Sequence, residues 1–371
     1  MGKYNLDIYR GKTVLVTGDT GFKGSWLSIW LTELGAQVIG YSLEPPTKPN
    51  MFEATGLGKK HTHLLGDVRD EKRLLSVFRE HRPELVFHLA AQPIVRRSYK
   101  DPRLTYETNV MGTVNLLEAV RKTECAKVAI VITSDKCYEN KEPTCGYKES
   151  DPMGGYDPYS SSKGCAELVV SAYRNSFFSS KCGSGKVALA SVRAGNVIGG
   201  GDWGEDRLVP DCVRALSAER EVVIRNPTYI RPWQYVLEPL GGYLLLGTKM
   251  YEDCVRYVGA WNFGPLEDDA ISVEEIVKRI ISYWGSGKYR IESSGSEPHE
   301  ARLLRLDCTK ARTLIGWKSA YTIDETLKET VAWYREFYKK RVSSNLYDFA
   351  VKQIIEYTTK SGLYADFPKI R

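Results

Sequence analysis

A tyrosine and a lysine four residues apart could form a proton-transfer pair. In the run Tyr159-Ser160-Ser161-Ser162-Lys163, a helical backbone puts the phenol and the ammonium on one face. A free tyrosine has a pKa of about 10, and a nearby cation lowers that pKa because it favours the phenolate. Asp157 and Pro158 suit the N-cap and the first turn of such a helix. The pattern predicts a base at Tyr159, and the alternative is an exposed helical pair.

Ser134, Asp135 and Lys136 form a second polar group, directly after the apolar run 128–132. A continuous apolar run is typical of a parallel strand that is buried on both faces. Ligands of open α/β sheets bind at the carboxyl ends of such strands. A hydroxyl and a carboxyl placed there could orient a sugar alcohol and deliver a proton to a leaving group. The alternative is a polar turn after a strand.

A glycine-rich turn, Gly18-Asp19-Thr20-Gly21-Phe22-Lys23-Gly24, follows a strand expected at 13–16. Glycines at this spacing let backbone N–H groups approach a pyrophosphate at a helix N-terminus, although an ordinary glycine turn is the alternative. Ser42 lies near the end of the next expected strand, and Glu44 lies 20 residues after Gly24. No arginine follows immediately to attract a 2′-phosphate, which favours NAD over NADP.

The elements that position these groups follow an alternating pattern. Short apolar runs occur at 13–16, 36–41, 85–89, 128–132 and 187–192, and amphipathic stretches separate them. The alternation predicts an α/β fold, a Rossmann-type doubly wound parallel sheet with a smaller C-terminal α/β substrate lobe. From Gly195 onward, Gly, Pro and Trp interrupt the alternation. We expect an NAD-binding domain at 1–190 and a substrate-binding domain at 191–371, and we leave open whether C-terminal segments return to the first lobe.

The composition is that of a globular protein with a small excess of positive charge. The 371 residues include 52 Lys and Arg against 46 Asp and Glu, a net charge of +6. This excess is too small to predict nucleic-acid binding and is compatible with an anionic small substrate. The eight cysteines form no Cys-x-x-Cys pair and we find no histidine at metal-ligand spacing, so we expect reduced thiols, a cytoplasmic location and no metal. No run reaches the roughly 18 apolar residues of a membrane span.

Together, these motifs resemble the extended short-chain dehydrogenase/reductase family. The shared signatures are the glycine-rich turn, Leu89-Ala90-Ala91-Gln92, Ser134-Asp135, and Tyr159 with Lys163. Longer runs, at 17–26, 134–138, 195–203 and 230–234, resemble the subgroup of that family that dehydrates CDP-glucose. The resemblance extends from about Gly11 to Trp333.

The resemblance implies sites for NAD and for CDP-glucose. The residues that it assigns to the cofactor are Gly18, Thr20, Gly21, Phe22, Lys23, Gly24, Asp67, Val68, Leu89, Ala90, Ala91, Tyr159 and Lys163. Arg231 matches the arginine that contacts the diphosphate in the family, while Asn196 and Arg207 fall in the segment that lines the substrate site. Helices near 106–121 and 160–177 would pair subunits, giving a homodimer or a dimer of dimers.

In the implied reaction, Tyr159 takes the proton of the sugar 4-hydroxyl while a hydride passes from C4 to NAD⁺. Lys163 lowers the tyrosine pKa and holds the nicotinamide ribose, and Ser134 hydrogen-bonds the 4-oxygen. Water is then lost across C5 and C6, with Asp135 protonating the departing 6-hydroxyl, and the hydride returns to C6. The product is a 4-keto-6-deoxy sugar, and NAD⁺ is regenerated.

Lys136 departs from the pattern of the broader group of nucleotide-sugar dehydratases. Relatives that act on dTDP- or GDP-sugars usually have Glu at this position, as the base that removes the C5 proton. A lysine can do so only when it is deprotonated, from an ordinary pKa of about 10.4. We assign Lys136 to this step, and the alternative is that it holds a substrate oxygen.

Two other functions stay open on the sequence. A nucleotide-sugar 4-epimerase would use the same tyrosine and lysine but would need no acid at Asp135. A non-catalytic protein that binds a dinucleotide or a nucleic acid would need none of these three groups.

Overall fold

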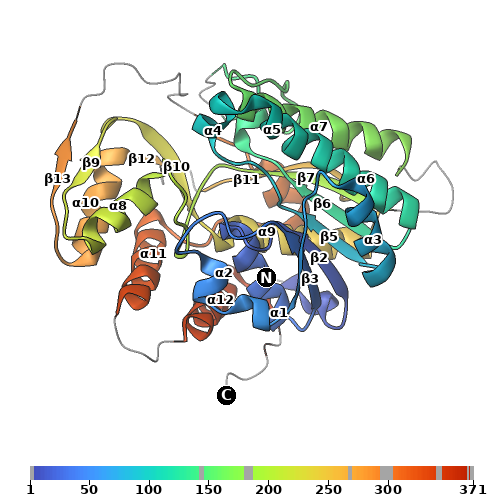
Figure 1. The fold of residues 1–371 in the computed structure, drawn as a ribbon, viewed down its shortest axis with the longest axis horizontal. Coiled ribbons are helices and arrows are strands. Elements are labelled where there is room, and N and C mark those ends of the chain that lie inside the picture. The colour runs from blue at the N-terminus through green and yellow to red at the C-terminus, as the bar shows by residue number, and fades with distance from the viewer. Residues whose placement is uncertain are drawn as a thin grey trace.

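Seven parallel strands form the central sheet of the structure, a computed structural model that describes residues 4–141, 146–178, 187–265, 270–292, 304–339, 345–365 and 367 (Figure 1). In sheet order they are β11 (Gly259–Phe263), β7 (Ala188–Ala194), β6 (Val128–Ile132), β5 (Leu85–His88), β2 (Thr13–Thr17), β3 (Gln37–Ser42) and β4 (Thr62–Leu65). Every neighbouring pair is parallel. The chain order reverses between β2 and β5, so the carboxyl ends of these strands form the switch point at which such sheets bind ligands.

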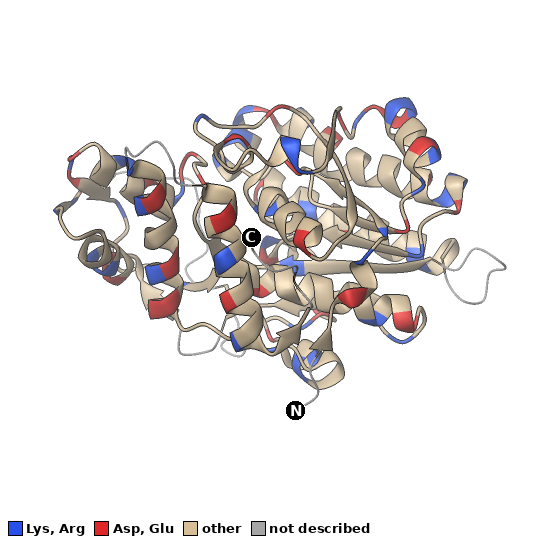
Figure 2. Cartoon of the chain, turned by 90° about the horizontal axis from the view of Figure 1, so that it is seen from below, with Lys and Arg blue, Asp and Glu red and all other residues tan. Residues whose placement is uncertain are grey.

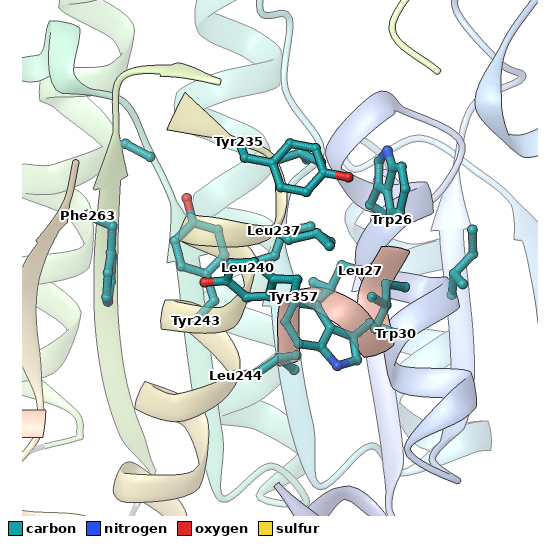
Figure 3. Close-up of a cluster of buried hydrophobic side chains, with 14 of the residues drawn as sticks. Trp26, Leu27, Trp30, Tyr235, Leu237, Leu240, Tyr243, Leu244, Phe263 and Tyr357 are labelled. Atoms are coloured by element: carbon teal, nitrogen blue, oxygen red, sulfur yellow. The ribbon is translucent and has the colours of Figure 1, made fainter. Parts of the chain in front are cut away.

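Helices cover both faces of this sheet (Figure 1). On one face lie α3 (Glu71–His81), α6 (Gly112–Thr123) and α7 (Pro158–Ser176), and on the other lie α1 (Phe22–Glu33), α9 (Leu237–Glu252) and α12 (Leu346–Ser361). Figure 3 shows the second face, where Trp26 and Trp30 of α1, Leu240 of α9 and Tyr357 of α12 belong to one fully buried cluster. This three-layer arrangement confirms the predicted doubly wound fold.

A smaller lobe follows the sheet. Its strands are β8 (Asn196–Ile198), β10 (Ile230–Tyr235) and β12 (Ala270–Ser272) in one sheet, and β9 (Val222–Ile224) and β13 (Tyr289–Ile291) in another. Its helices are α8 (Leu208–Ser217), α10 (Val273–Trp284) and α11 (Ile323–Tyr338). Although α9 and β11 come after residue 190, α9 packs on the central sheet and β11 pairs with β7. The chain after residue 190 therefore contributes to both lobes.

The remaining elements are short. They are β1 (Tyr4–Asn5), paired with β14 (Leu363–Tyr364), the helices α2 (Met51–Ala54), α4 (Val95–Lys100) and α5 (Pro102–Tyr106), the π-helical turns Glu107–Met111 and Ala311–Ile315, and the 3-10 turns Asp7–Tyr9, Leu57–Lys59 and Asp135–Cys137. Among the described residues, no helix is both long and apolar enough to cross a membrane.

Local signals explain where several elements begin and end. The Asp157 side chain accepts the Ser160 N–H at 2.9 Å and Pro158 opens α7, as predicted. Strand β6 has the predicted bounds, and β3 extends one residue beyond the predicted end, to Ser42. Arg82, with a φ of 44°, ends α3 just before Pro83.

A buried ion pair joins α7 to β7 beneath the carboxyl ends of the strands. Arg193 of β7 donates to both carboxylate oxygens of Glu167 of α7, at 2.9 and 2.7 Å, and the two side chains are 3% and 4% exposed. The hydroxyls of Thr133 and Ser191 donate to the same carboxylate, at 2.5 and 2.7 Å. Removing one partner would leave a charge without water or a counter-ion.

We therefore expect Arg193→Met to lower the free energy of unfolding by about 3–5 kcal/mol. The double variant with Glu167→Leu should lose less than the sum of the two single variants, because neither charge is left alone. Denaturant unfolding of the wild type, both single variants and the double variant measures this. Additive losses would contradict the expectation.

Candidate active site

The glycine-rich turn leads from β2 into α1, as predicted. Gly18 has a φ of +77°, and a Cβ on it would lie 2.8 Å from the backbone N of Ala90. A Cβ on Gly24 would lie 2.0 Å from the carbonyl oxygen of Gly18. The N-cap of α1 is Gly21, which has no side chain to bond the first N–H groups of the helix. Such uncapped amides at a helix N-terminus suit a phosphate group.

The other residues predicted to bind the cofactor follow neighbouring strands. Leu89, Ala90 and Ala91 follow β5, and Asp67 and Val68 follow β4 after Gly66. The carboxyl ends of parallel strands meet at one edge of a sheet, so the structure brings these residues to the same edge as the glycine-rich turn.

Ser42, rather than an acidic residue, ends β3. Its hydroxyl donates to Asp19 Oδ1 at 2.7 Å and lies 2.9 Å from Thr20 Oγ1. Glu44, the other candidate, is exposed. A ribose hydroxyl could hydrogen-bond to this group, whereas a 2′-phosphate would meet the negative charge of Asp19.

Ser134 and Asp135 lie just beyond β6, where the sequence predicts them. The Ser134 hydroxyl donates to Asp135 Oδ1 at 2.9 Å and accepts the N–H of Lys136 at 3.2 Å. Burial raises the pKa of Asp135, and the opposing effects of Lys136 and Ser134 do not cancel the shift. A carboxyl with a raised pKa keeps its proton more readily, which suits a general acid. Lys136 itself is half-buried.

Tyr159 lies in the first turn of α7 and is 8% exposed. Burial raises the pKa of its phenol to about 12, although a hydrogen bond with Ser134 acts in the opposite direction. That Lys163 and the positive ring of the cofactor together lower this pKa stays a prediction, since desolvation is the larger effect in the protein alone. A base at neutral pH needs a further positive charge beside the phenol, such as an oxidised nicotinamide ring.

Two lysines, the buried Lys163 and the half-buried Lys23, accompany these groups. The Nζ of Lys163 donates to the Ile132 carbonyl at 3.4 Å, and burial lowers the pKa of Lys163 to about 8. Burial, with repulsion from Arg207, lowers the pKa of Lys23 to about 8, and attraction to Asp135 partly offsets this. An anionic ligand at this edge would stabilise both ammonium groups.

The residues predicted to bind the substrate come from the second lobe. Arg207, the N-cap residue of α8, donates to Asp202 Oδ2 at 2.8 Å, and its charge acts on the nearby Tyr159. Asn196 begins β8 and follows Gly195, on which a Cβ would lie 3.0 Å from Asp135 Oδ2. The structure thus brings Arg207 and Asn196 to the Ser134–Tyr159 group.

Arg231 is placed differently. It lies near the start of β10, and its guanidinium lies 5.2 Å from the ring centroid of Tyr229. Its assignment to a diphosphate stays a prediction.

The residues present fit an NAD cofactor. The uncapped start of α1 suits the pyrophosphate, and the Ser42 hydroxyl suits the adenosine ribose. The buried ammonium of Lys163 has one long hydrogen bond, to Ile132, and could donate to hydroxyls of the second ribose.

Sequence reasoning missed the groups that support this site. Arg193 and Glu167 lie behind it, and Asp202 holds Arg207. The sequence contained one signal for the ion pair, a charged residue inside an otherwise apolar strand. Such a residue requires a buried partner, but the sequence does not say which residue that partner is.

Comparisons with known proteins agree with this geometry. The model of the GDP-mannose 4,6 dehydratase family matches residues 15–330, and the chain belongs to that family of Rossmann-fold proteins. The chain is 52% identical to the CDP-glucose 4,6-dehydratase of Salmonella typhimurium, over 89% of this chain and 92% of the relative. The resemblance predicted from the sequence is confirmed.

Two solved structures share the fold. UDP-glucose 4-epimerase from Thermotoga maritima, solved with UDP-glucose, is 26% identical with a TM-score of 0.73, over 87% of this chain and 99% of that one. UDP-glucose 4-epimerase from Thermus thermophilus, solved with NAD, is 24% identical with a TM-score of 0.74, over the same shares.

The lowered pKa of Lys163 predicts a pH-dependent stability. A lysine whose folded pKa of about 8 lies below its unfolded value of about 10.4 destabilises the fold while it is charged, and this cost disappears as pH rises from 8 to above 10. Lys163→Met should therefore be more stable than the wild type at pH 7, by about 3 kcal/mol, and the difference should shrink between pH 8 and pH 10.

Urea unfolding at a series of pH values measures this difference. Lys72→Met, which removes an exposed lysine of α3, is the matched control and should show no such trend. A stability difference for Lys163→Met that stays constant with pH would contradict the assignment.

Proposed function

We propose that the protein is an NAD-dependent hydro-lyase that converts CDP-D-glucose to CDP-4-dehydro-6-deoxy-D-glucose. The observation that carries this proposal is the buried Asp135 carboxyl, with its raised pKa, beside Ser134 and Tyr159. A reaction that expels a hydroxyl needs such an acid. The relative that is 52% identical supports CDP-glucose as the substrate.

The first half of the reaction uses Tyr159, Ser134 and Lys163. NAD⁺, when bound, accepts the hydride from C4 of the sugar and returns it at C6. Tyr159 Oη takes the proton of the 4-hydroxyl, and the Ser134 hydroxyl hydrogen-bonds the same oxygen. Lys163 holds the nicotinamide ribose, and its positive charge favours the phenolate.

The elimination uses Asp135 and Lys136. The 4-ketone acidifies the C5 hydrogen, and Lys136, which must first be deprotonated to act as a base, takes that proton. Asp135 gives its proton to the departing 6-hydroxyl, which leaves as water. Its raised pKa keeps this proton available closer to neutrality than that of an exposed aspartate.

The sugar nucleotide lies on the side of the second lobe. Its diphosphate is held by Arg231 and Arg207, since guanidinium groups bind phosphate oxygens in a bidentate manner. Asn196, next to Gly195 at Asp135, contacts the sugar. The assignments of Arg207 and Asn196 rest on their placement and on the family resemblance, and that of Arg231 rests on the resemblance alone.

We further infer a homodimer or a dimer of dimers in the cytoplasm. Large apolar side chains are exposed around α6 and α7, at Tyr106, Met111, Leu168 and Phe177, and covering them in a subunit interface would stabilise the assembly. The six cysteines within the described residues are free thiols, as expected in a reducing compartment.

Incubation with CDP-glucose and NAD⁺ tests the function. We expect a product that has lost one water, detected by mass, with the alkali-revealed absorbance of a 4-keto sugar. Recovery of CDP-galactose alone would instead establish the epimerase. A screen with dTDP-, GDP- and UDP-glucose should show the highest kcat/KM for CDP-glucose. Tyr159→Phe should abolish turnover, and an unchanged rate would point to another base.

If Lys136 is the C5 base, its substitution should slow the elimination of water and leave the oxidation at C4 intact. In D₂O the wild type should place deuterium at C5, and Lys136→Met should lose water elimination by about 10²–10⁴-fold while C4 oxidation persists as reduced cofactor absorbance. Lys136→Arg should be equally defective, because a guanidinium stays protonated.

Full activity of Lys136→Arg would show that residue 136 only holds a substrate oxygen. Asp135→Asn should also stop elimination after C4 oxidation, whereas Asp324→Asn, an exposed control on α11, should behave as the wild type.

A further inference from the structure

Asp19, in the glycine-rich turn, contacts two histidines at the edge of the central sheet. Its Oδ2 lies 3.0 Å from His61 Nε2 and 2.8 Å from His63 Nδ1. His63 lies in β4 and His61 directly precedes that strand, so the alternation of a strand turns both side chains to one face. All three potential ligand atoms lie within 4.8 Å of one another.

The cluster is enclosed. The side chains of Asp19 and His61 are 0% and 1% exposed, and that of His63 is 21% exposed. Gly40 of β3 makes room for it, since a Cβ there would lie 2.0 Å from Asp19 Oδ2 and 2.8 Å from His61 Nε2. The ring of Phe52 covers the imidazoles, with centroids 6.1 Å from His61 and 5.0 Å from His63.

We propose that Asp19 Oδ2, His61 Nε2 and His63 Nδ1 bind one divalent transition-metal ion of the zinc or cobalt type. Two imidazoles and one carboxylate form a donor set that such ions prefer, while magnesium and calcium prefer oxygen atoms alone. The sequence alone predicted no metal site. A His-x-His pair becomes a ligand pair only when it lies on a strand that faces a third donor, and here that donor, Asp19, is 42 residues away from His61.

The spacing of the donors is close to that of a metal site. With bonds of about 2.1 Å at right angles, neighbouring ligand atoms lie about 3.0 Å apart, and in a tetrahedron about 3.4 Å apart. The observed 2.8 and 3.0 Å between Asp19 Oδ2 and the two histidine nitrogens are close to this spacing, and the histidine nitrogens lie within 4.8 Å of each other. Each imidazole would carry its proton on the ring nitrogen that does not bind the ion.

Further contacts support this assignment. The Ser42 hydroxyl donates to the other carboxylate oxygen, Oδ1, and so orients Asp19, as groups behind a metal ligand commonly do. The partly exposed His63 marks the side from which an ion and its water ligands could enter. A bound ion would tie the glycine-rich turn to β4 and neutralise a carboxylate beside the expected pyrophosphate site.

Isothermal titration of chelator-treated, untagged protein with ZnCl₂ tests the proposal. We expect one ion per chain and a rise in melting temperature on addition of zinc. Titration with cobalt(II) should give the visible absorption of a nitrogen- and oxygen-ligated ion. Asp19→Asn, His61→Gln and His63→Gln should each weaken zinc binding by at least about tenfold.

His81→Gln is the matched control, since it removes a histidine of α3 outside the cluster. If Asp19→Asn fails to fold, His63→Gln still tests the proposal. The wild-type imidazole of His63 is partly exposed, so its replacement should leave the fold intact. No zinc binding by the wild type, or wild-type affinity in His63→Gln and His61→Gln, would overturn the proposal and leave a hydrogen-bonded cluster. No cofactor or sugar is present, so this outcome is independent of the proposed enzymatic function.

Discussion

Cationic side chains gather at the carboxyl edge of the central sheet. Lys23 and Lys163 both have pKa values lowered to about 8 by burial, and the guanidinium of Arg207, paired with Asp202, lies beside them. Asp135 lies beside them, and burial raises the pKa of its carboxyl. Elsewhere, on the side shown in Figure 2, Lys and Arg are interspersed with Asp and Glu along the outer helices. The net charge of +6 therefore has its functional meaning at this edge, where a dinucleotide and a sugar diphosphate would complete the electrostatics.

The sheet makes this concentration of charge possible. Strands β2, β5 and β6 are neighbours and parallel, so the residues that follow them meet although they are far apart in the chain. The Glu167–Arg193 pair then holds α7, which carries Tyr159 and Lys163, against β7. A site that needs groups fixed within a fraction of an ångström benefits from support by regular elements.

Periodic and local features could be read from the sequence, and contacts between distant residues could not. The bounds of β6, the Asp157 cap of α7 and the glycine-rich turn depend on neighbours in the chain, and all three were predicted. The contacts of Asp19 with His61 and His63 span 42 and 44 residues, and no periodicity reports them. The desolvation that raises the pKa of Tyr159 could not be read from the sequence either, because it depends on packing by residues that are distant in the chain.

The same edge also explains how one scaffold can support two reactions. A tyrosine and a lysine would support oxidation of a sugar at C4 by bound NAD⁺, and the dehydratase proposed here would need in addition an acid for the 6-hydroxyl. That acid exists only if Asp135 is kept from water, because an exposed aspartate is ionised at neutral pH. Gly195 presses against it, since even a methyl group there would lie 3.0 Å from Oδ2. In the proposed reaction, the burial of this one carboxyl is therefore what would allow the ketone to be followed by loss of water.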